Sequence, residues 1–123
     1  MIALELKRCS EIKGSTNAMS DLECEQMLGQ LSMWKIILVN GSKSLAKRFV
    51  FVSYHQALLF TKSIAAAAIL ENHHPKIILE YDSVEVNWWT HSVKGLHMND
   101  FVMAAKSDTS FLSIKEKLIE SSL

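Results

Sequence analysis

Apolar and polar residues in the first half of the chain predict a helix followed by a β-hairpin. Residues 20–31 open with a capping box, a serine followed three positions later by a glutamate, which predicts the start of a helix. Residues 34–39 form a β-rich run, Asn40-Gly41 is a strong signal for a tight turn, and residues 45–51 alternate between the two faces of a strand. The apolar residues expected on the buried face of the helix are Leu22, Met27 and Leu31.

The second half of the chain predicts another helix and another hairpin. A second capping box opens residues 53–71, where alanines and larger apolar residues recur at helical spacing. Pro75 cannot continue that helix, and residues 76–81 and 84–91 predict two further strands. A last helix is expected from about Met98 onward. The order α-β-β-α-β-β-α predicts an α+β fold, a four-stranded antiparallel sheet covered on one face by helices.

The predicted strand at residues 84–91 has two different faces. Its two-residue period places Val84, Val86, Trp88 and Thr90 on one side and Glu85, Asn87, Trp89 and His91 on the other. We therefore expect Trp88 in the core and Trp89 beside His91.

Length and local composition indicate one domain that follows a lead-in. Residues 1–18 mix charged residues with glycine, serine, threonine and asparagine and show no period, so a flexible or extended segment is expected. Residues 19–123 suffice for a single hydrophobic core, to which an oligomer interface would add materially. We expect one domain that assembles.

Charge and hydropathy exclude several classes of partner. Thirteen Lys and Arg residues balance thirteen Asp and Glu residues, so the composition offers no attraction to nucleic acid or an anionic membrane. The longest apolar run, residues 64–70, falls far short of the roughly 20 residues that a membrane span needs. A carboxylate interrupts the first residues before a signal-like apolar region can form. We expect a cytoplasmic protein without a nucleic-acid or membrane partner.

Histidine is concentrated in one window of the chain. Four of the 5 histidines lie between residues 73 and 97. Because imidazole titrates near neutrality, such a cluster is the commonest way to place a general acid and a general base in one pocket. If the sheet brings His91 near the corner at His73 and His74, three imidazoles meet Asp100, which we expect in the first turn of the last helix.

Each of these residues also has a structural interpretation. Adjacent histidines at a corner are commonly polar surface residues, and His91 could be an ordinary histidine at the end of a strand. Asp100 could stabilise a helix N-terminus, where carboxylates interact with free N–H groups. We interpret His55 and His97 as structural or surface residues. No single residue is decisive.

Metal binding is the less favoured interpretation of the histidines and cysteines. Three histidines could form a zinc site with an open position, but no HxH or HExxH spacing is present. His73 and His74 would point to opposite sides of an extended chain. Cys9 and Cys24 lack the CxxC partners of a structural zinc site and do not fit a disulfide framework well, so two reduced thiols are favoured.

An ordered set of residues resembles the signature of the pterin-4a-carbinolamine dehydratase family. The signature residues are His73-His74-Pro75, Tyr81, His91 and Asp100. The similarity extends to Trp34, the aromatic run at residues 48–51, Ala57 and Phe60 of the predicted helix, and residues 88–101. It covers about residues 20–108, and its last stretch is similar to bacterial members in particular.

The resemblance implies a hydro-lyase that removes water from 4a-hydroxytetrahydropterin to give quinonoid dihydropterin, without a cofactor or a metal ion. Loss of the 4a-hydroxyl needs an acid and loss of the N5 proton needs a base, and histidine can supply both at neutral pH. By resemblance, His73 and His91 are acids on the two sides of the pterin ring, and His74 is the N5-side base and substrate anchor. Asp100 would orient an imidazole. The residues implied near the pterin are Pro75, Thr90 and Ser92.

The resemblance also implies partners and an alternative. It implies a homodimer or homotetramer and a functional link to an aromatic amino acid hydroxylase, which releases the substrate. Animal members of the family also act as dimerisation cofactors of a homeodomain transcription factor, so a non-catalytic binding protein of the same fold is the alternative. A metal-dependent hydrolase is supported only by the number of histidines.

One position departs from the pattern of the family. Members commonly have a glutamate four residues before the first histidine, where this chain has Ile69. The nearest carboxylate is Glu71, but two residues along a helix correspond to a rotation of about 200°, so we expect it to face elsewhere unless the helix has ended. This departure is expected to lower activity or to change substrate preference.

Overall fold

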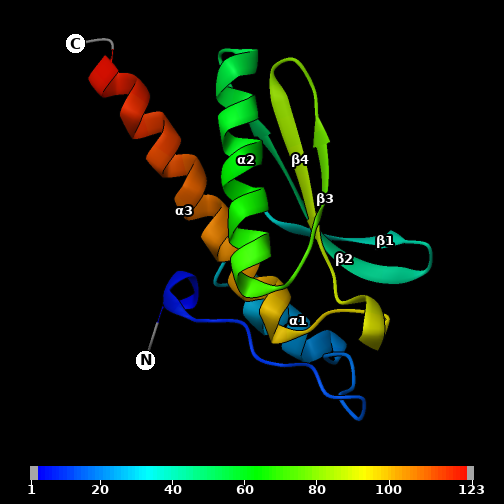
Figure 1. Cartoon of the computed structure of the whole chain (residues 1–123). Coiled ribbons are helices and arrows are strands. Elements are labelled where there is room, and N and C mark those ends of the chain that lie inside the picture. The colour runs from blue at the N-terminus through cyan, green and yellow to red at the C-terminus, as the bar shows by residue number, and fades with distance from the viewer. Residues whose placement is uncertain (1–2, 122–123) are drawn as a thin grey trace.

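The computed structural model describes residues 3–121, with side chains as far as residue 115, and shows an antiparallel sheet packed against helices (Figure 1). The α-helices of this described part are α1 (Asp21–Leu28), α2 (Tyr54–Glu71) and α3 (Met98–Ser121). The strands are β1 (Lys35–Val39), β2 (Ser42–Val50), β3 (Lys76–Leu79) and β4 (Ser83–Trp88), and short 3-10 helices lie at Leu4–Leu6 (η1) and His91–Val93 (η2). The predicted α+β fold and its order of elements are confirmed.

Each hairpin contributes one central and one edge strand to the sheet. The strand order is β1-β2-β4-β3, and every neighbouring pair is antiparallel. The first hairpin closes at Asn40 and Gly41, whose φ angles of 52° and 80° are those of a tight turn with a left-handed backbone. Gly41 adopts this conformation without the steric cost that a Cβ would bring. The hairpins thus join β2 to β4 at the centre of the sheet.

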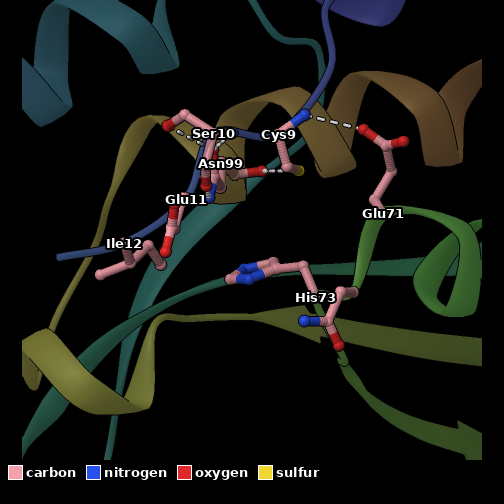
Figure 2. A pocket seen from close by; sticks show the side chains of 8 residues that line it. Cys9, Ser10, Glu11, Ile12, Glu71, His73 and Asn99 are labelled. Carbon is pink, nitrogen blue, oxygen red and sulfur yellow. Dashed lines mark hydrogen bonds between the residues drawn. The ribbon is translucent and has the colours of Figure 1, made fainter.

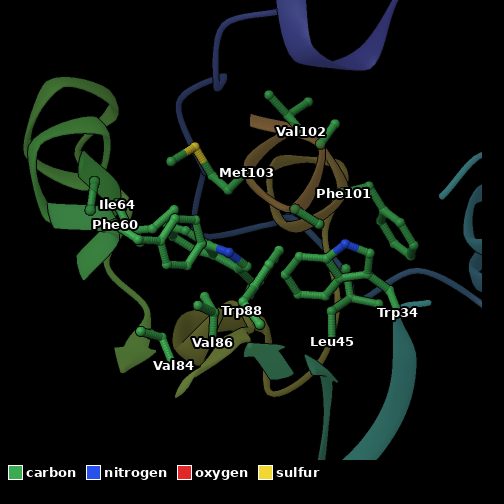
Figure 3. Close-up of a cluster of buried hydrophobic side chains, with 14 of the residues drawn as sticks. Trp34, Leu45, Phe60, Ile64, Val84, Val86, Trp88, Phe101, Val102 and Met103 are labelled. Carbon is green, nitrogen blue, oxygen red and sulfur yellow. The ribbon is translucent and has the colours of Figure 1, made fainter. Parts of the chain in front are cut away.

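The core lies between one face of the sheet and the helices α2 and α3. Figure 1 shows α2 running alongside β3 and β4, and Figure 3 shows Val84, Val86 and Trp88 of β4 in the buried cluster. The Trp88 indole N–H donates to Ser107 Oγ of α3 at 3.0 Å, so this buried donor is satisfied. Burial of each large apolar side chain contributes about 1.5–3 kcal/mol to folding. The alternation predicted for β4 is confirmed up to Trp88.

Helix α1 is shorter than expected, and its buried residue is a different one. It ends at Leu28, and Gly29 follows as its C-cap. A glycine is unfavourable in a helix interior by about 1 kcal/mol relative to alanine, which favours an end here. Cys24 is the buried residue of α1, whereas Leu22 is exposed, so the prediction of a buried Leu22 was wrong.

Strand β4 ends before His91, contrary to the expectation for residues 84–91. The chain forms an isolated bridge between Thr90 and Gly95, in which the Thr90 N–H donates to the Gly95 carbonyl at 2.9 Å. Lys94 has a left-handed backbone with φ of 54°, which closes this small loop. His91 therefore opens η2, and its side chain is not placed by the strand period.

Candidate functional site

The corner between α2 and β3 sends the first two histidines of the window to different environments. Asn72 caps α2 in the left-handed conformation, and the N–H groups of Asn72 and His73 both donate to the Ala68 carbonyl. After this turn the side chain of His73 is buried, at 9% exposure, whereas His74 is exposed. The sequence predicted that the two side chains point to opposite sides, but not which of them is buried.

A buried carboxylate joins three distant parts of the chain. Asp100, in the first turn of α3, is 0% exposed. Its Oδ1 lies 2.6 Å from His73 Nε2 at the α2–β3 corner. Its Oδ2 accepts from the Thr90 hydroxyl, beyond β4, at 2.8 Å and from the His97 N–H at 2.9 Å. Such charge-assisted bonds are strong and directional, so Asp100 fixes the position of the His73 ring.

The orientation of His73 is also fixed by packing. Its ring stacks on the Trp88 indole with 5.9 Å between centroids and 9° between planes. Because Asp100 accepts at Nε2, the assignment that satisfies this contact places a proton on Nε2 and leaves Nδ1 to exchange a proton with another group. His73 is therefore held as a rigid imidazole with one nitrogen available.

Asp100 and His97 also stabilise the start of α3. The Asn99 N–H donates to His97 Nδ1 at 3.0 Å, and the His97 N–H donates to Asp100 at 2.9 Å. Burial lowers the pKa of His97 below its ordinary value, although the Asp100 carboxylate opposes this effect. A neutral imidazole is the form that can accept from Asn99. These contacts fit the interpretation of His97 as a structural residue. Asp100 stabilises the N-terminus of the helix, as one interpretation proposed, and also contacts His73.

The remaining residues expected at the site lie outside this hydrogen-bonded group. Among the described residues, the group joins His73, Thr90 and Asp100 and leaves out His74, Pro75, His91 and Ser92. The side chains of His74, His91 and Ser92 are exposed, and Pro75 is half-buried. The structure therefore separates a buried, fixed histidine from two that are open to solvent.

A cavity of about 350 Å³ lies beside His73 (Figure 2). Its lining residues are Cys9, Ser10, Glu11, Ile12, Glu71, Asn72, His73 and Asn99. The volume is in the range of small-molecule sites. Only His73 of this set was expected from the sequence. The N-terminal residues carry no period that could have indicated their place, because what positions them is contact with residues far along the chain.

Glu71 and Asn99 hold the N-terminal segment against the cavity. The Cys9 N–H donates to Glu71 Oε1 at 2.7 Å, and Arg8 Nε donates to the other carboxylate oxygen. The Ser10 N–H donates to Asn99 Oδ1 at 2.9 Å, and Asn99 Nδ2 donates back to the Ser10 carbonyl at 2.8 Å. The two bonds accepted by Glu71 and the reciprocal pair between Ser10 and Asn99 thus fix residues 8–10.

Glu71 and Ile69 lie on different sides of α2. Ile69 is 74% exposed on α2, whereas the Glu71 side chain is 2% exposed and lines the cavity. The two residues do face different sides, as the helical rotation predicted. The side of Glu71 is the one that carries the cavity, and the sequence could not show this.

Glu71 is expected to stabilise the protein in a pH-dependent way. Burial would raise its pKa, but the Cys9 N–H and Arg8 outweigh burial and hold the pKa below its ordinary value of 4.5. A lowered carboxyl pKa stabilises the folded state above that ordinary value, and the stabilisation disappears as the pH falls through the folded-state pKa. The stability lost in Glu71→Gln should therefore be largest at neutral pH and shrink below about pH 4.5. Urea unfolding of both proteins between pH 7 and pH 3 measures this, with Glu80→Gln at an exposed position as control; a constant difference would contradict the assignment.

Thiols, possible metal ligands and apolar helices of the described residues bear on the remaining expectations. Cys9 and Cys24 are free thiols, and burial, followed by the charge of Glu71, raises the pKa of Cys9 to about 11. No three His, Cys, Asp or Glu side chains gather closely enough to hold a metal ion within the described residues. No helix within residues 3–121 combines the length and apolar character that a membrane crossing needs.

Comparisons with known proteins converge on one family. The family model described as pterin 4 alpha carbinolamine dehydratase matches residues 17–110. A relative from Saccharophagus degradans, named as a candidate pterin-4-alpha-carbinolamine dehydratase, is 54% identical over 86 residues, which cover 70% of this chain and 76% of the relative.

Two solved structures resemble the fold. A transcriptional coactivator/pterin dehydratase from Brucella melitensis aligns with a TM-score of 0.70 and 29% identity over 76% of this chain and 98% of the other. A pterin dehydratase-like protein described as a RuBisCO assembly factor in the alpha-carboxysome aligns with a TM-score of 0.56 and 23% identity, over 65% and 90% of the two chains. The second similarity concerns the fold alone.

Proposed function

Because the chain belongs to the pterin 4 alpha carbinolamine dehydratase family, we propose that it removes water from 4a-hydroxytetrahydropterin and releases quinonoid dihydropterin. The observation that carries this proposal is the His73 imidazole, which is held by Asp100 and lines a cavity of suitable size. An imidazole fixed by a buried carboxylate is a recurrent arrangement for proton transfer. The reaction breaks a carbon–oxygen bond with loss of water, and its proposed role in the cell is to recycle a pterin cofactor.

The reaction needs one proton delivered and one proton removed. The C4a–O bond breaks as a proton reaches the leaving hydroxyl, which departs as water, and the N5 proton passes to a base. The electron pair of the N5–H bond forms the new C=N bond, so no oxidant and no covalent intermediate is required. Groups with an ordinary pKa near 6.5 can act as acid or base at neutral pH. Histidine chemistry is sufficient for each step.

Three of the histidines have proposed roles in the reaction. His74 is the base at N5 and anchors the substrate, and its exposed side chain is accessible to a ligand. His73 and His91 are the acids on the two sides of the ring. Asp100 acts as a positioning residue through His73, which its 2.6 Å contact supports. The residues proposed to lie near the pterin are Pro75, Thr90 and Ser92.

The proposal includes partners and a cellular location. The substrate would come from an aromatic amino acid hydroxylase in the cytoplasm, and no nucleic acid or membrane takes part. We propose a homodimer or homotetramer. The edge strands β1 and β3 have unpaired backbone groups along one side within the described chain, which is a physical motive for pairing with another copy.

The proposal is tested by following the decay of chemically generated 4a-hydroxytetrahydropterin. The wild-type protein is expected to accelerate the decay over buffer, and the rate should be unchanged by a chelator because histidines supply the acid and the base for the loss of water. A buffer-like rate would refute the enzyme assignment. A rate abolished by chelation would favour a metal-dependent reaction instead.

A binding protein of the same fold is the second candidate. Ile69 favours it, because a carboxylate common in the family is missing at that position. The solved structure from Brucella melitensis is described as a transcriptional coactivator as well as a pterin dehydratase, so a role other than dehydration is named for a protein of this fold. A purified protein that leaves the decay unchanged but retains tight pterin-independent binding to another protein would support this candidate.

A further inference from the structure

One wall of the cavity beside His73 comes from the N-terminal segment, residues 9–12. The family model matches the chain only from residue 17, so this wall lies outside the matched part. Figure 2 shows Glu11 and Ile12 on the same side of the cavity, opposite the corner that carries His73. The wall therefore comes from residues that precede the part of the chain matched by the family model.

The segment is anchored on both sides of the cavity wall. Upstream, Leu4 is buried in the core and Lys106 Nζ donates to the Glu5 carbonyl at 2.9 Å. At the wall, the bonds to Glu71 and Asn99 fix residues 8–10, and downstream the Met19 N–H donates to the Leu96 carbonyl at 2.8 Å. Residues 11 and 12 are thus held between anchored neighbours.

The carboxylates of Glu71 and Glu11 both line the cavity, but they differ in whether their oxygens are free to bind a ligand. Both oxygens of Glu71 accept bonds from the N-terminal segment, through Cys9 and Arg8. Glu11 is exposed, and its side chain makes no hydrogen bond or ion pair with any residue whose side chain the structure describes. Glu11 therefore supplies a carboxylate that faces a ligand in the cavity without a competing partner.

A free carboxylate matches one edge of a pterin. The 2-amino group and the N3–H of the pyrimidinone ring are adjacent donors that point the same way, and a carboxylate accepts two such bonds at once. We propose that Glu11 is a specificity-determining residue that binds this edge while the reacting C4a and N5 atoms lie toward His73. This inference rests on the proposed function, from which it takes the substrate class.

The test compares binding of a 7,8-dihydropterin with that of the matching dihydrolumazine, in which a carbonyl replaces the 2-amino group. Wild-type protein should prefer the pterin, since the carbonyl would face the carboxylate. Glu11→Gln should bind the pterin roughly ten- to hundredfold more weakly, the range for loss of a bond to a charged group, and should lose most of the preference. Glu5→Gln, an exposed glutamate of the same segment outside the cavity, should bind as wild type.

Titration followed by ligand fluorescence or calorimetry gives these constants independently of turnover. Equal weakening of both ligands in Glu11→Gln, or no weakening, would overturn the role of Glu11. A wild type that accelerates dehydration but does not distinguish the two ligands would overturn it as well, with the dehydratase assignment intact. A wild type that prefers the pterin through Glu11 but leaves the decay rate unchanged would support the pocket and refute the reaction.

Discussion

Replacement of His74 by alanine is expected to slow dehydration by about 10²- to 10⁴-fold, the usual contribution of a general acid or base. His74 is the proposed base at N5 and also the proposed anchor of the substrate, so one truncation removes two contributions. Its side chain is exposed, so the fold should be retained, with a change in stability within about 0.5 kcal/mol. The effect should exceed that of His73→Ala or His91→Ala.

Steady-state rates with 4a-hydroxytetrahydropterin measure this effect, and thermal unfolding checks the fold. His55→Ala is the matched control, because His55 is also an exposed histidine but lies in the first turn of α2, outside the histidine window. It should keep the wild-type rate. A His74→Ala protein that folds and turns over as fast as wild type would remove His74 from the mechanism.

Replacement of Asp100 by alanine is expected to lower the free energy of unfolding by about 3–5 kcal/mol, because each donor left without its acceptor costs about 1–3 kcal/mol. The change leaves His73 Nε2, the Thr90 hydroxyl and the His97 N–H without their acceptor. It also removes the carboxylate from the first turn of α3. For a domain whose total stability is typically 5–15 kcal/mol, this is a large fraction.

Urea unfolding measures the loss, with Asp21→Ala as the control. Asp21 is also a carboxylate at the start of a helix and pairs with Lys43, but its side chain is 87% exposed. An exposed ion pair contributes about 0–1 kcal/mol, so the control should be close to wild type. Similar losses in both variants would mean that burial of Asp100 does not determine its contribution.

The arrangement of helices and strands could be predicted because it depends on local patterns. The alternation through Val84, Val86 and Trp88 correctly assigned one face of β4 to the core. The same alternation did not predict the side of His91 correctly. The regular strand ends before the Thr90–Gly95 bridge, and side chains alternate with a period of two only within a regular strand. The prediction of a buried Leu22 was also wrong, since α1 is too short to require a wide apolar face.

The site could be predicted only in part, because much of it depends on long-range contacts. Asp100 was correctly predicted to lie in the first turn of α3. Its contact with His73 depends on how the fold brings these two distant residues together. The roles of His73, His74 and His91 stay predictions. The wall at residues 9–12 was not foreseen, since its position depends on Glu71 and Asn99, which are distant in sequence.

The double use of Asp100 limits what can be learned from finding this residue in related sequences. It accepts the N–H of His97 at the start of α3 and also contacts His73, so the helix needs it whether or not a reaction takes place. A relative that had lost the dehydration step would still be selected to keep this aspartate for folding. Under the mechanism proposed above, an exposed histidine at the position of His74, which no hydrogen bond of the described chain explains, would be the more discriminating mark of an active member.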